Sequence, residues 1–257
     1  MMVTVPRIAA VSYLNTIPFI YGIEHAGDLR AELLTFPPAD CARAFREGRA
    51  DVALVPAAAV PSLAGARIVT DYCIGASGPV RTVVLAGDTP PELAERVYLD
   101  PHSLTSVQLA GYLYAECWHR TPEYFVLDDC RRLDRPAPGD AFLLIGDKVF
   151  DREDRFVCSR DLAAEWIRAT GLPFVFAVWV AREEVAPETT DALQRALTFG
   201  IEHTYEAIVA HGFDRKPYDA YDYLTRNIDF VFDIEKRRAL RKFWDSGLKV
   251  SPRANPG

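Results

Sequence analysis

The sequence predicts an α/β protein of two lobes, each with a mixed, mostly parallel sheet flanked by helices. Short apolar runs of strand length alternate with helical patterns along most of the 257 residues, as expected for β-α-β units. Two extended segments, near 80–86 and 174–181, interrupt this alternation, and we interpret them as crossings between the lobes. Residues 1–84 and 178–257 then form the first lobe, and residues 85–177 form the second.

The first lobe begins with a buried strand and a helix. Residues 7–11 are mainly apolar and follow Pro6, which indicates a strand, and Pro18 is typical of the first turn of a helix. The rest of this lobe has strand patterns at 33–36, 51–56 and 69–74, a short amphipathic helix at 40–47, and later helical patterns at 187–210, 218–225 and 234–244.

Four polar side chains separate the first strand from the first helix: Ser12, Tyr13, Asn15 and Thr16. In open α/β sheets, ligands bind beyond the carboxyl ends of the strands, where the N–H groups of a following helix can hold an anion. The same side chains can instead serve only as caps of the helix. Their position in the sequence leaves both interpretations open.

The second lobe has two more polar positions next to predicted strands. Strand patterns occur at 96–100, 123–127 and 141–145, and helical patterns at 104–118 and 161–170. Ser103, Thr105 and Ser106 crowd the first turn of a helix; one is expected to cap it, and the group is a candidate anion site. Asp147 follows a strand and Gly146, so its carboxylate is either a helix cap or a site residue.

Composition argues against several classes of partner and site. The net charge of −7 and the pI of about 5.3 do not fit a general nucleic-acid or anionic-membrane surface. The five cysteines include no CxxC pair and the five histidines no HExxH pattern, so neither a disulfide framework nor a metal site is expected. No signal peptide is evident, and no apolar run approaches the roughly 20 residues of a membrane span. We therefore expect a cytoplasmic protein without a membrane partner.

Six motifs follow one another along most of the chain: Val11-Ser12-Tyr13-Leu14-Asn15-Thr16-x-Pro18, Ala50-Asp51-Val52-Ala53-Leu54-Val55-Pro56, Ser77-Gly78-Pro79-Val80, Leu99-Asp100-x-x-Ser103-x-Thr105-Ser106, Ile145-Gly146-Asp147 and Thr170-Gly171-Leu172-Pro173-Phe174-Val175-Phe176-Ala177-Val178-Trp179. Together they resemble the chorismate dehydratase family of the futalosine route to menaquinone. The resemblance implies a type II periplasmic-binding-protein-like fold with a ligand cleft between the lobes.

The implied reaction removes water from chorismate to give 3-[(1-carboxyvinyl)oxy]benzoate. It involves no redox change, so no cofactor is expected. By this resemblance Asn15 takes the place of the family's active-site asparagine. An amide cannot act as a general base at neutral pH, but it can hydrogen-bond the leaving hydroxyl or a carboxylate and fix the reactive conformer.

The resemblance also implies roles for other residues. Thr105 and Ser106 would hold one carboxylate of the substrate, while Ser77 and Thr82 would line the cleft. The general base is left open among Asp147, Glu116 and the substrate's own enolpyruvyl carboxylate, with the substrate favoured. The catalytic candidates are Asn15, Thr82, Asp147 and Glu116, and the substrate-binding candidates are Ser12, Tyr13, Thr16, Ser77, Val80, Arg81, Ser103, Thr105, Ser106, Phe174 and Trp179.

Two other functions remain as alternatives. A non-catalytic protein that binds small carboxylates could use the same two-lobed fold without any chemistry. The sister enzyme 1,4-dihydroxy-6-naphthoate synthase shares the fold, but its N-terminal motif Ser-Pro-Cys-Pro-Asn-Asp differs from Ser12-Tyr13-Leu14-Asn15-Thr16. Beyond chorismate as a small-molecule partner, a homodimer stays open.

Overall fold

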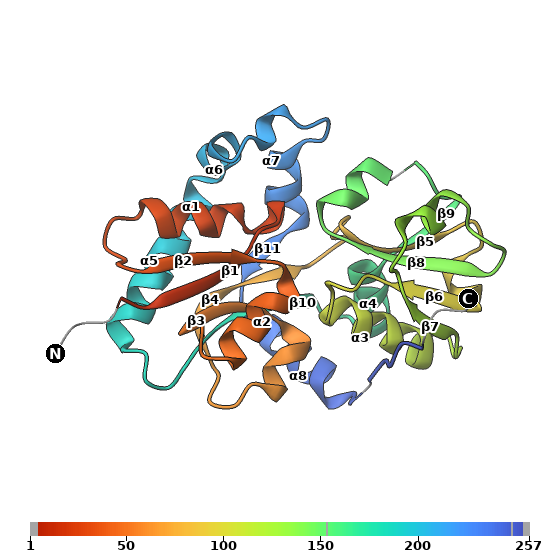
Figure 1. Ribbon diagram of the computed structural model, residues 1–257, viewed down its shortest axis with the longest axis horizontal. Helices are drawn as coiled ribbons and strands as arrows, with labels where there is room; N and C mark the ends of the chain where they lie inside the picture. Colours follow the sequence, from red (N-terminus) through yellow and green to blue (C-terminus); the bar gives the residue numbers. More distant parts are fainter. Residues whose placement is uncertain (1–4, 153, 248, 254–257) are drawn as a thin grey trace. The chain divides into compact units, whose positions relative to one another are not determined.

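The computed structural model describes residues 5–152, 154–247 and 249–253, and these form two compact units (Figure 1). Unit 1 holds the described residues up to Gly75 together with Val175–Ile234. Unit 2 holds Ala76–Phe174 and the described residues from Glu235 onward. The segment from Glu235 was expected with the outer segments of the first lobe, and the structure groups it with the middle of the chain instead.

Unit 1 is built on a six-stranded sheet in the order β11-β4-β10-β3-β1-β2. Its strands are β1 (Arg7–Val11), β2 (Glu32–Phe36), β3 (Val52–Pro56), β4 (Arg67–Ala76), β10 (Phe174–Ala181) and β11 (Asp229–Val231). β1 pairs in parallel with β2 and β3, as expected for β-α-β units, whereas β10 is antiparallel to β3 and β11 is antiparallel to β4. The sheet is therefore more evenly mixed than the expected mostly parallel arrangement.

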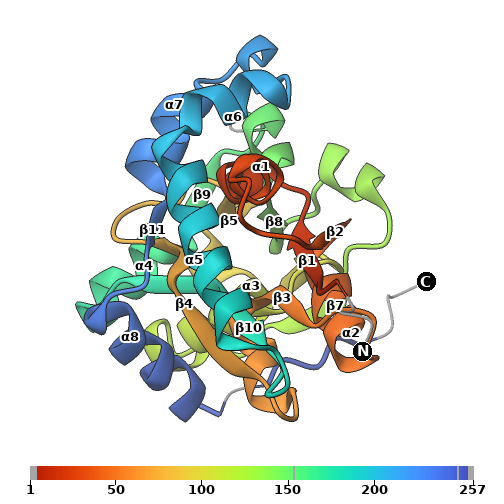
Figure 2. The ribbon, with the colours of Figure 1, turned by 90° about the vertical axis from the view of Figure 1, so that its left-hand side faces the viewer.

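The helices of unit 1 are α1 (Ile17–His25), α2 (Pro38–Arg46), α5 (Pro187–Glu202), α6 (Thr204–Ala210) and α7 (Ala220–Asp222). α1 crosses against α5 (Figure 2), and a glycine from each helix lies at the contact. A Cβ on Gly200 would lie 1.8 Å from the carbonyl oxygen of Pro18, and one on Gly22 would lie 2.0 Å from that of Ala196. The two backbones approach so closely that only glycine fits, and this packing holds the start of α1 in place.

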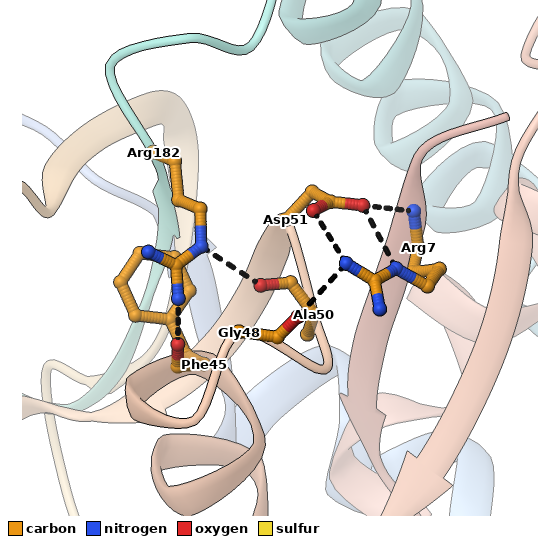
Figure 3. Close-up of polar contacts among 6 residues, drawn as sticks. All are labelled: Arg7, Phe45, Gly48, Ala50, Asp51 and Arg182. Carbon is orange, nitrogen blue, oxygen red and sulfur yellow. Dashed lines mark hydrogen bonds and ion pairs between the residues drawn. The ribbon is translucent and has the colours of Figure 1, made fainter. Parts of the chain in front are cut away.

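A polar network fixes the amino-terminal ends of β1 and β3 (Figure 3). Asp51 accepts hydrogen bonds from the backbone N–H of Arg7 at 2.9 Å and from its Nε at 3.1 Å and Nη2 at 2.9 Å. Arg182 lies over the Phe45 ring and donates to the carbonyl oxygens of Phe45 and Ala50. Burial tends to raise the pKa of Asp51, but the hydrogen bonds from Arg7 outweigh it and lower the pKa below its ordinary 3.8.

Unit 2 is built on a five-stranded sheet in the order β7-β6-β8-β5-β9. Its strands are β5 (Val83–Gly87), β6 (Arg96–Leu99), β7 (Glu123–Val126), β8 (Asp140–Ile145) and β9 (Cys158–Asp161), and its helices are α3 (Thr105–Tyr112), α4 (Leu162–Thr170) and α8 (Ile234–Asp245). β6 is parallel to β7 and β8, and β5 is antiparallel to β8 and β9. The predicted α/β class is confirmed in both units.

The last helix joins unit 2 because its apolar side packs there. The Phe243 ring of α8 meets the ring of Trp166 at 6.1 Å and the ring of Phe174 at 5.3 Å between centroids, both edge to face. Within the described residues no helix is long and apolar enough to cross a membrane.

Candidate functional site

The polar turn after β1 is held by the buried hydroxyl of Thr16. Thr16 is 1% exposed, and its Oγ1 lies within hydrogen-bond distance of the carbonyl oxygens of Val11 and Tyr13, the latter at 2.7 Å. Its one hydroxyl hydrogen thus ties the end of the strand to the 3₁₀ turn Leu14–Thr16. The exposed Ser12 donates its backbone N–H to Phe36 at 3.2 Å and extends the ladder between β1 and β2. These contacts give Thr16 a structural task and fix the residues around it.

Asn15 takes no part in the hydrogen bonds that fix this turn. It is half-buried in the same 3₁₀ turn, between the carboxyl end of β1 and the start of α1. Among the residues that the structure describes, the Asn15 amide has no hydrogen-bond partner. Its oxygen can accept and its nitrogen can donate, so the side chain is equipped to bind both a hydroxyl and a carboxylate.

Trp179 lies in the core of unit 1 rather than at this turn. Its side chain is fully buried, and its ring meets Phe19 edge to face at 5.8 Å. The indole Nε1 is buried and has no hydrogen-bond partner within the described ranges. A buried donor without a partner is unusual in folded proteins.

In unit 2 the segment before β5 makes a strained turn at Arg81. Arg81 has a φ of +63°, and the N–H of Thr82 donates to the carbonyl oxygen of Val80 at 2.8 Å. A bond across one residue with positive φ at the centre is the rare γ-turn. Asp161 holds the turn by accepting the Arg81 N–H at 2.6 Å, while Gly146 donates to the Thr82 carbonyl at 2.9 Å. The turn is therefore over-determined by its neighbours, as strained positions at functional sites usually are.

Burial affects both the side chains of this turn and the carboxyl that holds it. Val80 and Thr82 are each 1% exposed, whereas Ser77 is exposed. Burial raises the pKa of Asp161, and backbone N–H groups, including that of Ala164 at the start of α4, partly offset the rise.

The three hydroxyls at the start of α3 divide into one cap and two others. Ser103 Oγ accepts the N–H of Ser106 at 3.2 Å, so Ser103, one residue before the N-cap Leu104, satisfies an N–H of the first turn, as the sequence predicts for one of these hydroxyls. Thr105 and Ser106 are 3% and 4% exposed. The Ser106 hydroxyl has no hydrogen-bond partner in the described part of the chain. Because its N–H is already used by Ser103, Ser106 can offer a ligand its hydroxyl.

An ion pair between Asp100 and Lys148, which the sequence did not predict, lies beside the start of α3. Asp100 is 1% exposed, accepts the N–H of His102 at 2.9 Å and pairs with the ammonium group of Lys148. The same short turn carries the backbone bond from Ser103 to the Asp100 carbonyl, at 3.2 Å. Asp100 directly follows β6, the kind of place that drew attention to Asp147, so the strand-end criterion could have found it.

Three other predicted residues lie in different surroundings. Asp147 is half-buried and opens a 3₁₀ turn directly after Gly146. Glu116 is exposed in the π-helical turn Leu113–Cys117, eleven positions beyond Thr105 and thus about 16 Å along the helix from its start. Phe174 is 1% exposed and packs on Trp166 at 5.2 Å. The structure therefore keeps Glu116 away from the start of α3 and places Phe174 in the core of unit 2.

Arg81 is one of the residues that line a pocket of 320 Å³ inside unit 2. Its guanidinium lies over the Phe150 ring at 5.3 Å. The pocket is lined by Pro79, Arg81, Val84, Ala86, Leu144, Val149, Arg152, Phe156, Ser159 and Asp161. Among the described residues, no three histidine, cysteine, aspartate or glutamate side chains gather as metal ligands.

Solved structures with the same fold come from several organisms. Protein AF1704 from Archaeoglobus fulgidus is similar with a TM-score of 0.74 at 18% identity, over 95% of this chain and 97% of that one. The CA3427 gene product of Candida albicans, described as having the generic periplasmic binding protein fold, has a TM-score of 0.63 at 14% identity, over 97% and 92%. The alkanesulfonate-binding protein SsuA from Xanthomonas axonopodis pv. citri, bound to MOPS, has a TM-score of 0.64 at 13% identity, over 94% and 90%.

These likenesses confirm the periplasmic-binding-protein-like fold, a fold that binds small molecules in SsuA. The sequence itself matches a family described as "Menaquinone biosynthesis" over residues 6–248. That match covers nearly the whole chain and includes all the motifs noted above. The chain belongs to the menaquinone biosynthesis family.

Proposed function

We propose that this protein is a chorismate dehydratase, a hydro-lyase that converts chorismate to 3-[(1-carboxyvinyl)oxy]benzoate and water. Membership of the menaquinone biosynthesis family supports a role in that pathway. The observation that carries the specific proposal is the Asn15 amide. It stands at the carboxyl end of β1 with no partner among the described residues, where ligands of open α/β sheets bind.

The reaction breaks one C–H bond and one C–O bond. A base takes the ring proton at the ether-bearing carbon, the neighbouring hydroxyl leaves with a proton as water, and the new double bond completes the aromatic ring. Aromatisation drives the step, so the protein has to hold the dianion in its reactive conformer and stabilise the leaving hydroxyl. In this proposal Asn15 hydrogen-bonds the leaving hydroxyl or a carboxylate.

In unit 2, the start of α3 is proposed to bind a carboxylate. The Ser106 hydroxyl supplies a donor, and the positive end of the helix dipole favours negative charge at this place. Thr82, held by the γ-turn at Arg81, is proposed to line the site from the segment before β5. The enolpyruvyl carboxylate of the substrate is proposed as the base, with Asp147 and Glu116 as the protein alternatives. Glu116 is the less favoured of the two, since it is exposed and lies in the π-helical turn Leu113–Cys117.

The direct test is to incubate the purified protein with chorismate and to follow ultraviolet absorbance and product mass. The proposal expects a product lighter than chorismate by one water. Chorismate that binds and is recovered unchanged would overturn the dehydratase in favour of a carboxylate-binding protein. Neither binding nor conversion would also overturn it, and would direct attention to the sister 1,4-dihydroxy-6-naphthoate synthase activity.

A further inference from the structure

The ion pair between Asp100 and Lys148 links two segments of unit 2 that carry candidate site residues. Asp100 follows β6, and Lys148 belongs to the turn that follows β8. These strands are parallel neighbours in the sheet, so their carboxyl ends lie at the same edge. The Asp100 side chain is fully buried, whereas that of Lys148 is 40% exposed. The carboxylate is thus removed from water, and the ammonium group of Lys148 compensates its charge.

On one side of the pair, Asp100 holds the turn that leads into α3. Its Oδ1 accepts the N–H of His102 at 2.9 Å, and its carbonyl oxygen accepts the N–H of Ser103 at 3.2 Å. Ser103 Oγ in turn accepts the N–H of Ser106. Through these hydrogen bonds Asp100 fixes the backbone that carries the Ser106 hydroxyl.

On the other side of the pair, Lys148 lies in the 3₁₀ turn Asp147–Arg152, directly after Asp147. The N–H of Gly146, just before this turn, donates to the Thr82 carbonyl oxygen at 2.9 Å. The turn is therefore tied to the segment before β5 by a backbone hydrogen bond and to the segment before α3 by the Lys148 side chain. The ion pair and this hydrogen bond connect all three segments that carry Thr82, Ser106 and Asp147.

We propose that Asp100 and Lys148 are positioning residues of the proposed active site, which hold the start of α3, and with it the Ser106 hydroxyl, against the turn that follows β8. The inference rests on the proposed function, because it assigns the pair to the binding and dehydration of chorismate. The pair acts through the two segments that it joins and does not contact the substrate. A group that is displaced by about 1 Å can cost on the order of a hundredfold in rate, so a fixed link between these segments affects turnover.

The first test compares the steady-state kinetics of Lys148→Met and Lys148→Arg with those of the unaltered protein. Lys148→Met is expected to lower kcat/KM for chorismate about tenfold or more, because the buried Asp100 carboxylate loses its partner and the turn before α3 shifts. Lys148→Arg keeps a cation on a long side chain and is expected to retain most of kcat/KM. The matched control is Lys242→Met, at an exposed position of α8 in the same unit, and it is expected to leave kcat/KM unchanged.

Asp100→Asn separates positioning from direct contact between Lys148 and the substrate. The amide oxygen can still accept the N–H of His102, but the charge that holds Lys148 is lost. If the pair is a link, Asp100→Asn lowers kcat/KM as Lys148→Met does, and the double variant is no worse than either single one. If Lys148 binds the substrate itself, Asp100→Asn frees its ammonium group, and kcat/KM stays unchanged or rises. That result would overturn the proposal.

A double-mutant cycle with Ser106 shows whether the effect passes through the start of α3. Isothermal titration with the dehydration product measures binding without turnover. Ser106→Ala is expected to weaken binding in the unaltered protein and to change it little in Lys148→Met, because the hydroxyl is then already displaced. Losses that simply add would contradict the link.

Thermal unfolding shows that each variant is folded at the temperature of the assay. A pair that only stabilises the fold would lower the Tm of Lys148→Met and leave kcat/KM below that Tm unchanged, which would overturn the inference. If the unaltered protein converts chorismate and Lys148→Met converts it equally well, the inference alone fails. If the unaltered protein does not convert chorismate, the proposed function fails and the inference fails with it.

Discussion

The polar residues at the strand ends differ in whether their side chains already form hydrogen bonds within the protein. Thr16 and Ser103 are occupied by backbone carbonyl and N–H groups, so they hold local structure. Asn15 and the Ser106 hydroxyl have no such partner in the described part of the chain. Folded proteins normally satisfy polar groups in such places with hydrogen bonds. A half-buried amide and a buried hydroxyl without partners therefore indicate that a ligand supplies those bonds.

We expect Asn15→Ala to lower kcat/KM for chorismate about tenfold or more, since a hydrogen bond to the reacting group is worth roughly 1.4 kcal/mol or more in the transition state. Steady-state kinetics measure the effect. Asn227→Ala truncates the other asparagine that the structure describes and controls for the loss of an amide. An unchanged rate for Asn15→Ala in a folded protein would remove Asn15 from the site.

The identity of the base can be decided at Asp147. If the substrate's own carboxylate takes the proton, Asp147→Asn is expected to keep most of the activity. A folded variant that still binds chorismate but loses more than about a thousandfold in kcat would assign the base to Asp147 instead. Single-turnover measurements separate the chemical step from binding.

At the scale of elements, the close packing of α1 on α5 holds the first turn of α1, which directly follows the turn that carries Asn15. Gly200→Ala is expected to lower the free energy of unfolding by about 1–3 kcal/mol, because its Cβ would lie 1.8 Å from the Pro18 carbonyl oxygen. In an unobstructed helix, alanine is more stabilising than glycine by about 1 kcal/mol. A loss of stability would therefore show that the steric clash outweighs the helix propensity of alanine. Gly78→Ala is the control, because nothing lies within 4 Å of its added Cβ. Urea unfolding measures both.

The Arg7–Asp51 network predicts a pH dependence. The pKa of Asp51 is below its ordinary 3.8 in the folded protein, so its ionised form stabilises the fold. That contribution is complete at pH values above the ordinary pKa and is lost as the pH falls through the folded value. The difference in Tm between the unaltered protein and Asp51→Asn should therefore shrink between about pH 6 and about pH 3. A difference that grows on acidification would contradict this sign.

At the scale of the whole molecule, the chain leaves unit 1 at Ile234 and ends in unit 2. Phe243→Ala is expected to cost about 3–5 kcal/mol of stability, because it removes a 4%-exposed ring from contact with Trp166 and Phe174. Hydrogen exchange should rise in α4, which carries Trp166. Lys242→Ala, at an exposed neighbouring position, serves as the control. Faster exchange confined to unit 1 would contradict the grouping.

Local pattern predicted much of the fold. Buried strands such as β1, β3 and β8 are continuous apolar runs, and α4 ends at Gly171, which has the left-handed φ of +70° expected of a helix cap. Two short strands escaped prediction. β9 (Cys158–Asp161) is polar, and β11 has three residues. Neither strand has a periodic sequence pattern of its own. Each forms by pairing with a longer strand, β9 with β5 and β11 with β4.

The sequence by itself determined the α/β class, the polar turn after β1, the hydroxyl cluster at the start of α3 and the family, because these depend on residues close together in the chain. Only the tertiary structure decided which polar groups the fold consumes, that Lys148 pairs with Asp100, that Asp161 holds the Arg81 turn, and that α8 packs on unit 2. Those contacts join residues far apart in sequence, and their energies depend on burial and distance, which no local pattern carries.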